Sequence, residues 1–284
     1  MRDAVFQSFV ESASPEQGPP RLARLRDEMR AEGLAGYLVP RADAYQGEYV
    51  APGDERLAWL TGFTGSAGFC VALLDTAGLF VDGRYRTQAR AQADPTHFQV
   101  VHWPETTPAS WIRKELEEGA KIGFDPWLYT PDQLSDIEKE LKDTGIDLVA
   151  GDNLIARCWP DRPAAPVGPV RVYPDALAGR SHAEKRAELA AVLSASGIRS
   201  AIITLPDSLA WLLNIRGSDI PRNPVPHGFA ILHDSGAVTL LIDGAKLDDD
   251  VRRHLGNDVA ILPIGDVANA LAELDGPVRL DRAS

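Results

Sequence analysis

Short apolar runs alternate with amphipathic stretches along this chain, and one such pattern occurs twice. The LAWL of residues 57–60 returns as LAWLL at 209–213, and GFCVALLDTAGLFVDG at 68–83 returns as GFAILHDSGAVTLLIDG at 228–244. An offset of about 150–160 residues has the length of a domain rather than of a solenoid repeat. We therefore predict two tandem copies of one domain.

Within each copy, the periodicity predicts short buried strands that alternate with helices. In the first copy, strands are expected at 35–39, 69–74, 78–82, 98–103, 121–125 and 146–152, and helices at 21–32, 56–60, 84–93, 109–117 and 131–142. In the second copy, strands are expected at 199–205, 229–233, 237–243, 259–264 and 277–281, and helices at 181–194, 209–213, 245–255 and 266–274. Tight hairpins join neighbouring strands in both copies, so the predicted class is α/β with mixed sheets flanked by helices.

Proline-rich and polar stretches set the predicted domain boundaries. We expect a loose leader at 1–20, a first α/β domain at 21–157, a linker with five prolines at 158–174 and a second α/β domain at 175–284. The last predicted strand matches 121–125 of the first copy, yet only three residues follow it. The sequence therefore predicts that the second domain is truncated and that the natural protein continues.

Composition narrows the function classes. The formal net charge is −12 and no basic run interrupts it, which disfavours nucleic-acid binding. No apolar run approaches the roughly 18 residues of a spanning helix, and the N-terminus lacks the apolar segment of a signal peptide. Cys70 and Cys158 are too few for a disulfide framework. Buried reduced thiols in a cytoplasmic protein, without a membrane partner, are expected.

Sequence spacing alone shows no catalytic constellation. The GFTGSAG of residues 62–68 has G-x-x-G-x-x-G spacing and leads into a hairpin, so it is interpreted as a structural turn that needs positive φ rather than as a dinucleotide fingerprint. The histidines do not stand at zinc-ligand spacing from one another. His233 is expected simply to end a strand. The KLDDD of residues 246–250 is interpreted as a solvated helix start.

Three polar stretches are candidates for a site. Asp82-Gly83-Arg84-Tyr85 follows a predicted strand, where loops often carry function, although a surface Asp–Arg pair explains it as well. Arg216-Gly217-Ser218-Asp219 with Asn223-Pro224 is either a shaped loop or one that faces a substrate. Tyr45, Glu48 and Tyr49 either line a groove or belong to ordinary packing.

Three stretches resemble the N-terminal part of the three-domain, cytosolic-type Xaa-Pro aminopeptidases (aminopeptidase P). They are PRADAYQGEYVAPGDERLAWLTGFTGSAG at 40–68, VDGRYRTQA at 81–89 and DSLAWLLNIRGSDIPRNPV at 207–225. The resemblance runs from about residue 21 to the end. It implies two creatinase-like domains followed by a pita-bread catalytic domain, in which two divalent metal ions, manganese by preference, are held by two Asp, one His and two Glu. None of these ligands can be placed in this chain.

The resemblance also implies a function. Such enzymes are hydrolases that remove the N-terminal residue from peptides with proline in second place, and their N-terminal domains wall the cleft and restrict entry to short peptides. Arg84 is the residue expected to face that cleft, where a guanidinium can meet a peptide carboxylate or carbonyl. The full-length enzyme is expected to be a homodimer through its catalytic domain, whereas this region alone can be a monomer. Without a bound metal, the chain alone is expected to be inactive.

Two other functions stay open. A creatinase-type C–N hydrolase shares the architecture, but such proteins have one N-terminal domain of this kind rather than two. A stand-alone binding or interaction module is the alternative from another class. It predicts a chain that ends after a completed second domain, and the short tail after 277–281 argues against it.

Overall fold

The computed structural model describes residues 13–284, which divide into two compact units. Unit 1 comprises the residues up to Arg41 together with Arg56–Asp125 and Ile137–Pro160. Unit 2 comprises Ala42–Glu55, Pro126–Asp136 and Asp161–Ser284. Two segments from the first half of the sequence therefore belong to unit 2.

Helices and strands alternate as the periodicity predicts. The α-helices are α1 (Gly18–Ala31), α2 (Arg56–Thr61), α3 (Arg86–Gln92), α4 (Pro108–Glu115), α5 (Pro131–Leu141), α6 (Leu154–Cys158), α7 (Asp175–Ala178), α8 (His182–Ala195), α9 (Pro206–Leu213), α10 (Asp249–Leu255) and α11 (Val267–Ala272). The strands are β1 (Gly36–Pro40), β2 (Phe69–Leu73), β3 (Ala77–Val81), β4 (Gln99–His102), β5 (Lys121–Phe124), β6 (Asp147–Ala150), β7 (Arg171–Val172), β8 (Ser200–Ile203), β9 (Ile215–Arg216), β10 (Phe229–His233), β11 (Val238–Leu241), β12 (Val259–Leu262) and β13 (Val278–Arg279).

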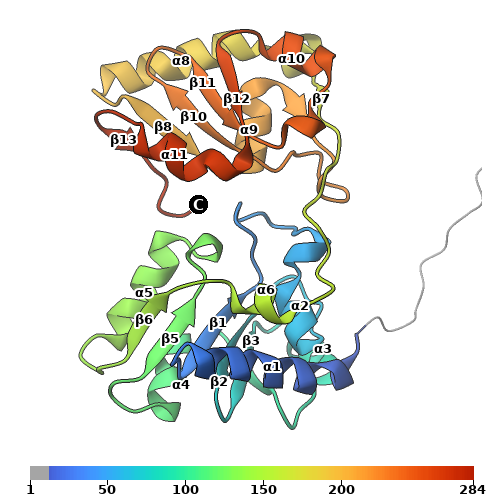
Figure 1. Cartoon of the computed structure of the whole chain (residues 1–284), viewed down its shortest axis with the longest axis vertical. Helices are drawn as coiled ribbons and strands as arrows, with labels where there is room; N and C mark the ends of the chain where they lie inside the picture. The colour runs from blue at the N-terminus through green and yellow to red at the C-terminus, as the bar shows by residue number, and fades with distance from the viewer. Residues whose placement is uncertain (1–12) are drawn as a thin grey trace, which may run out of the picture. The chain divides into compact units, whose positions relative to one another are not determined.

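The two larger sheets repeat one strand order (Figure 1). The first sheet runs β4-β3-β2-β1-β5-β6, and the second runs β12-β11-β10-β8-β13. In both, the central hairpin is antiparallel and the flanking strands pair in parallel: β2 with β3 and β10 with β11, then β3 with β4 and β11 with β12. The prediction of two copies with mixed sheets is confirmed. The tight hairpins force antiparallel pairs, and the helical crossovers force parallel ones.

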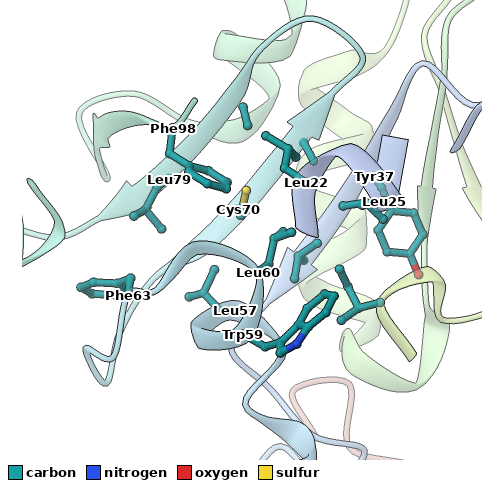
Figure 2. Close-up of a cluster of buried hydrophobic side chains, with 14 of the residues drawn as sticks. Leu22, Leu25, Tyr37, Leu57, Trp59, Leu60, Phe63, Cys70, Leu79 and Phe98 are labelled. Carbon is teal, nitrogen blue, oxygen red and sulfur yellow. The ribbon is translucent and has the colours of Figure 1, made fainter. Parts of the chain in front are cut away.

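The core of unit 1 lies between its sheet and the helices α1 and α2. Figure 2 shows Leu22 and Leu25 of α1 and Leu57 and Leu60 of α2 pointing toward the strands, beside the thiol of Cys70. The helix positions Leu22, Leu25 and Met29 are 0% exposed, as their spacing predicts. Each buried leucine side chain contributes about 1.5–3 kcal/mol through removal of apolar surface from water. Cys70 and Cys158 are both buried free thiols.

The sheet of unit 2 is packed on both faces. On one face, Leu209, Leu212 and Leu213 of α9 join the core against β10 and β11. On the other, Val267 and Ala270 of α11 pack beside Phe229, together with Ala44 and Tyr45 of the segment 42–55. A capping box begins α8: the Ser181 hydroxyl accepts from the Glu184 N–H, and the Glu184 carboxylate accepts from the Ser181 N–H.

Several boundaries differ from the predicted ones for local reasons. Residues 18–20 belong to α1 rather than to a loose leader, because the two prolines occupy its first turn, where no N–H is needed; residues 1–12 lie outside the described part. The helix expected at 245–255 begins only at Asp249, since Asp248 caps it through the N–H of Val251. The short elements α6, β7 and α7 were not predicted. Each has only two to five residues and lacks a continuous apolar run, so it carries too little periodicity to detect.

Candidate functional site

The first candidate is the turn that carries Arg84, between β3 and α3 in unit 1. Asp82 accepts the backbone N–H of Arg84 at 2.9 Å, and the guanidinium donates to the same carboxylate from Nη2 at 2.7 Å and from Nε at 3.1 Å. The Arg84 side chain is 68% exposed. Its hydrogen bonds hold the pKa of Asp82 below the usual value. Arg84 is therefore an exposed cation with a fixed direction.

Aromatic and hydroxyl groups complete this surface. The guanidinium carbon of Arg84 lies 5.2 Å from the centre of the Tyr85 ring, and the Tyr85 hydroxyl lies 2.6 Å from the hydroxyl of Ser66. That hydrogen bond lowers the pKa of Tyr85. Among the described residues, Nη1 of Arg84 forms no hydrogen bond, so its two N–H groups point to solvent or to a ligand. An arginine in this state can bind a carboxylate or a carbonyl oxygen.

The glycine-rich loop 62–68 supports this surface. Thr64 donates its N–H to the side chain of Gln92 at 3.0 Å and so ties the loop to α3. Only Gly62 of the three glycines has positive φ, at 83°. A Cβ at Gly65 would lie 2.1 Å from the ring of Phe63, and one at Gly68 would lie 2.8 Å from the carbonyl of Phe80. Close approach, rather than positive φ throughout, is what requires glycine here.

The second candidate, around Asp219 in unit 2, is a buried junction. The Asp219 side chain is 0% exposed. It pairs with the Lys246 ammonium at 2.8 Å and accepts the backbone N–H groups of His227 at 2.6 Å and of Gly168 at 3.0 Å. Its neighbour Arg216 lies 4.0 Å from the ring centre of Tyr173 and donates to the Ile215 carbonyl. The loop 216–219 therefore holds three distant segments together, and of the two interpretations the shaped loop fits.

The interpretation of residues 246–250 as a solvated helix start is wrong for Lys246. This residue is only 6% exposed and its ammonium pairs with Asp219. The acidic residues that follow do begin α10, as their sequence indicates. A lysine beside three aspartates has the sequence signature of a surface, and its true partner lies 27 residues away.

The third candidate, the segment 42–55, has a buried base and an exposed tip. Tyr45 stacks on His227 with ring centres 4.2 Å apart and on Phe229 at 4.9 Å. Glu48 and Tyr49 are exposed at the tip. Tyr45 therefore serves packing, whereas Glu48 and Tyr49 are presented to the surroundings.

Sequence reasoning missed the buried pair of Asp43 and His227. Their side chains approach to 3.7 Å between Oδ2 and Nε2, and the residues are 1% and 5% exposed. A single Asp in an aperiodic stretch and a lone His after proline gave no signal. Only the pairing of distant segments shows that they belong together.

Clusters of metal-ligating side chains were sought in the described part of the chain. Among residues 13–284, no three His, Cys, Asp or Glu side chains gather in a way that could hold a metal ion. The described helices also include none with the length and apolar character needed to cross a bilayer.

Comparison with known proteins identifies the class. The family model of the Creatinase/Prolidase N-terminal domain matches residues 21–158, and a second model of the same description matches residues 161–283. The chain belongs to the creatinase/prolidase family, of which it carries two N-terminal domains. The resemblance seen in the sequence is therefore confirmed.

Individual relatives show which members of the family this chain is similar to. A probable Xaa-Pro aminopeptidase P of Coccidioides posadasii is 38% identical over 94% of this chain, and that of Neosartorya fischeri is 40% identical over 89%. The chain spans 42% and 40% of the lengths of these two relatives. The crystal structure of X-prolyl aminopeptidase from Caenorhabditis elegans, described as a cytosolic enzyme with a di-nuclear active site, matches 90% of the chain with a TM-score of 0.85 and 36% identity. This chain covers 44% of that structure and corresponds to the N-terminal region of such enzymes.

Proposed function

We propose that this chain is the non-catalytic N-terminal region of a metal-dependent Xaa-Pro aminopeptidase, which removes the N-terminal residue from short peptides with proline second. One observation carries the proposal: the match to the C. elegans enzyme at a TM-score of 0.85 covers 90% of the chain and thus both of its domains. In this reading, a first domain at 21–157 and a second from 175 onward are joined by the proline-rich linker 158–174. The parent enzyme is a cytoplasmic homodimer, and its two metal ions, manganese by preference, are bound outside the residues described here.

Within this proposal, Arg84 is the residue that meets the substrate. Its guanidinium is exposed, held in direction by Asp82 and Tyr85, and has Nη1 available. A planar donor of this kind suits the carboxylate or a backbone carbonyl of a short peptide. Recognition of the far end of the peptide would favour short substrates, because a longer chain would carry its carboxylate past the guanidinium.

The test transplants this chain into an active relative. Residues 21–284 replace the matching region of the C. posadasii enzyme, and kcat/KM is measured for tripeptides and for longer peptides with proline second. We expect the chimaera to be active with Mn²⁺, and Arg84→Ala to lower kcat/KM for tripeptides about tenfold, close to 1.4 kcal/mol of transition-state binding. Arg86→Ala is the matched control, because Arg86 pairs with Glu105 and is expected to change little.

Other outcomes would favour the alternatives. An inactive but folded chimaera, together with direct binding of proline peptides by the 284-residue chain, would favour a stand-alone binding module. Hydrolysis of creatine by the full-length protein to which this chain belongs would favour the C–N hydrolase. Mn²⁺-dependent turnover of a proline peptide by the chain alone would contradict its assignment as a non-catalytic region.

A further inference from the structure

Asp43 and His227 form a sealed ionisable pair in unit 2. Oδ1 of Asp43 accepts the N–H groups of Tyr45 at 3.0 Å and Gly47 at 3.1 Å. Its other oxygen, Oδ2, is buried and has no hydrogen-bond partner among the described residues, and it faces Nε2 of His227 at 3.7 Å. A carboxylate oxygen that is buried away from water without a hydrogen-bond partner destabilises the fold. The arrangement calls for a proton between the two atoms.

The charges around the pair lead to the same conclusion. Asp219 is neutralised by Lys246 at 2.8 Å, and Asp54 by Arg162 at 3.1 Å. The Tyr45 ring that covers His227 is an uncharged phenol, because burial raises its pKa. With a neutral imidazole, Asp43 would be the one charge in this cluster without a counter-charge. A single added proton makes the whole cluster electroneutral, which a buried site strongly favours.

We propose that Asp43 and His227 share one proton, taken from solvent, which draws Oδ2 and Nε2 from their 3.7 Å separation into hydrogen-bond distance and so clamps the segment 42–55 onto the sheet of unit 2. The clamp makes them positioning residues for Glu48 and Tyr49 at the tip of that segment. With the proton on Oδ2, the carboxyl donates to Nε2. With the proton on Nε2, the imidazolium donates to the carboxylate. When the proton leaves, the carboxylate stays buried without a donor and the segment loosens.

The direction of the pH dependence follows from burial. Desolvation raises the pKa of Asp43 above 3.8 and lowers that of His227 below 6.5, and both shifts favour a neutral carboxyl beside a neutral imidazole. A group whose folded pKa is raised stabilises the fold fully at low pH and loses that contribution as the pH rises through the folded pKa. We therefore expect the clamp to be closed in acid and to open toward alkaline pH. This inference does not rest on the proposed enzymatic function.

Hydrogen exchange of residues 44–51 in the 284-residue chain tests the clamp. As the pH is raised, wild-type protection, corrected for intrinsic exchange, should fall about tenfold or more when the pair loses its proton. Asp43→Asn replaces the protonated carboxyl by an amide that donates to Nε2 and cannot titrate. Its protection should equal that of the wild type at low pH and should not vary with pH. The control Asp250→Asn, which removes an exposed carboxylate of α10 away from the cluster, should keep the wild-type dependence.

A second measurement reads the shared proton directly. The ¹⁵N shift of His227 Nε2 should follow the titration of Asp43 in the wild type, and that change should vanish in Asp43→Asn. Neither readout uses peptidase activity, so failure of this inference is distinguishable from failure of the proposed function. The clamp would be overturned by wild-type protection that does not change with pH, by an equal change in Asp43→Asn, or by a His227 titration that the substitution leaves intact.

Discussion

The turns at Asp82–Tyr85 and at Arg216–Asp219 each contain an aspartate, a glycine and an arginine, yet they are built in opposite ways. Asp82 pairs with Arg84, two residues away, and the arginine side chain is 68% exposed. Asp219 pairs with Lys246, 27 residues away, and both side chains are at most 5% exposed. In the first turn the aspartate and the arginine pair with each other, and the exposed guanidinium stays available to a ligand. In the second turn the carboxylate of Asp219 is fully occupied by contacts that join distant segments of the fold.

An arginine and an aspartate that share a glycine-containing turn are therefore not by themselves a functional signal. An exposed, local ion pair contributes little to stability, because water screens it and its partners keep competing solvent contacts. Removal of one partner of a buried pair is strongly destabilising, because the other partner then stays buried as an uncompensated charge. Stability measurements on matched variants should therefore separate the two turns clearly.

The largest effect is expected from Asp219→Ala. It leaves the Lys246 ammonium buried without its counter-charge and removes the acceptor of the His227 and Gly168 N–H groups. We expect a loss of about 3–5 kcal/mol in the free energy of unfolding, measured by urea titration. The double variant Asp219→Asn with Lys246→Met should recover much of it. A double variant as unstable as Asp219→Ala would show that the unpaired lysine is not the cause.

The second-largest effect on stability is expected from alanine substitution of the glycine in each turn, and the two substitutions should differ in cost. A Cβ at Gly217 would lie 2.3 Å from the backbone nitrogen of Pro226, whereas one at Gly83 would meet nothing within 4 Å. Because backbone atoms cannot move aside as a side chain can, Gly217→Ala should cost about 1–3 kcal/mol. Gly83→Ala should stay within about 0.5 kcal/mol of the wild type. Equal midpoints in urea for the two variants would contradict the difference in packing.

Acidification should produce a smaller loss in unit 2. Burial lowers the pKa of His182 and of His233 below 6.5, so the unfolded chain binds more protons than the folded one. The stability that the neutral imidazoles provide is complete above pH 6.5 and is lost as the pH falls through their folded pKa values. Urea midpoints should therefore fall measurably between about pH 7 and pH 5. His182→Phe removes one of these groups and should reduce the fall; an unchanged pH dependence would exclude His182 as a contributor.

The sequence was sufficient for the fold but not for these contacts. Periodicity located both hairpins and α1, because leucines at helical spacing and short apolar runs are local signals. The self-match at 68–83 and 228–244 revealed the tandem copies, which share one strand order. Arg84 could be singled out because its partner Asp82 lies in the same turn.

Burial of charged groups escaped prediction because it depends on segments far apart in the chain. Lys246 has surface composition on both sides, and only the fold brings it to Asp219. Asp43 and His227 are separated by more than half the chain and share no pattern. A long-range ionic contact has no period, so neither spacing nor propensity can reveal it.

The smallest effect is expected where the comparison began, at the exposed pair. Arg84 lowers the pKa of Asp82 below 3.8, so the pair can add stability only above that pH and loses it as the carboxylate takes a proton. Because the pair is open to solvent, screening reduces this contribution, and Asp82→Asn should leave the urea midpoint unchanged within error at low and at high salt. In the chimaeric enzyme, the same substitution should raise KM for tripeptides, since the guanidinium loses the group that fixes its direction. A clear loss of stability in Asp82→Asn would instead make this turn a second structural junction, equivalent to the one at Asp219.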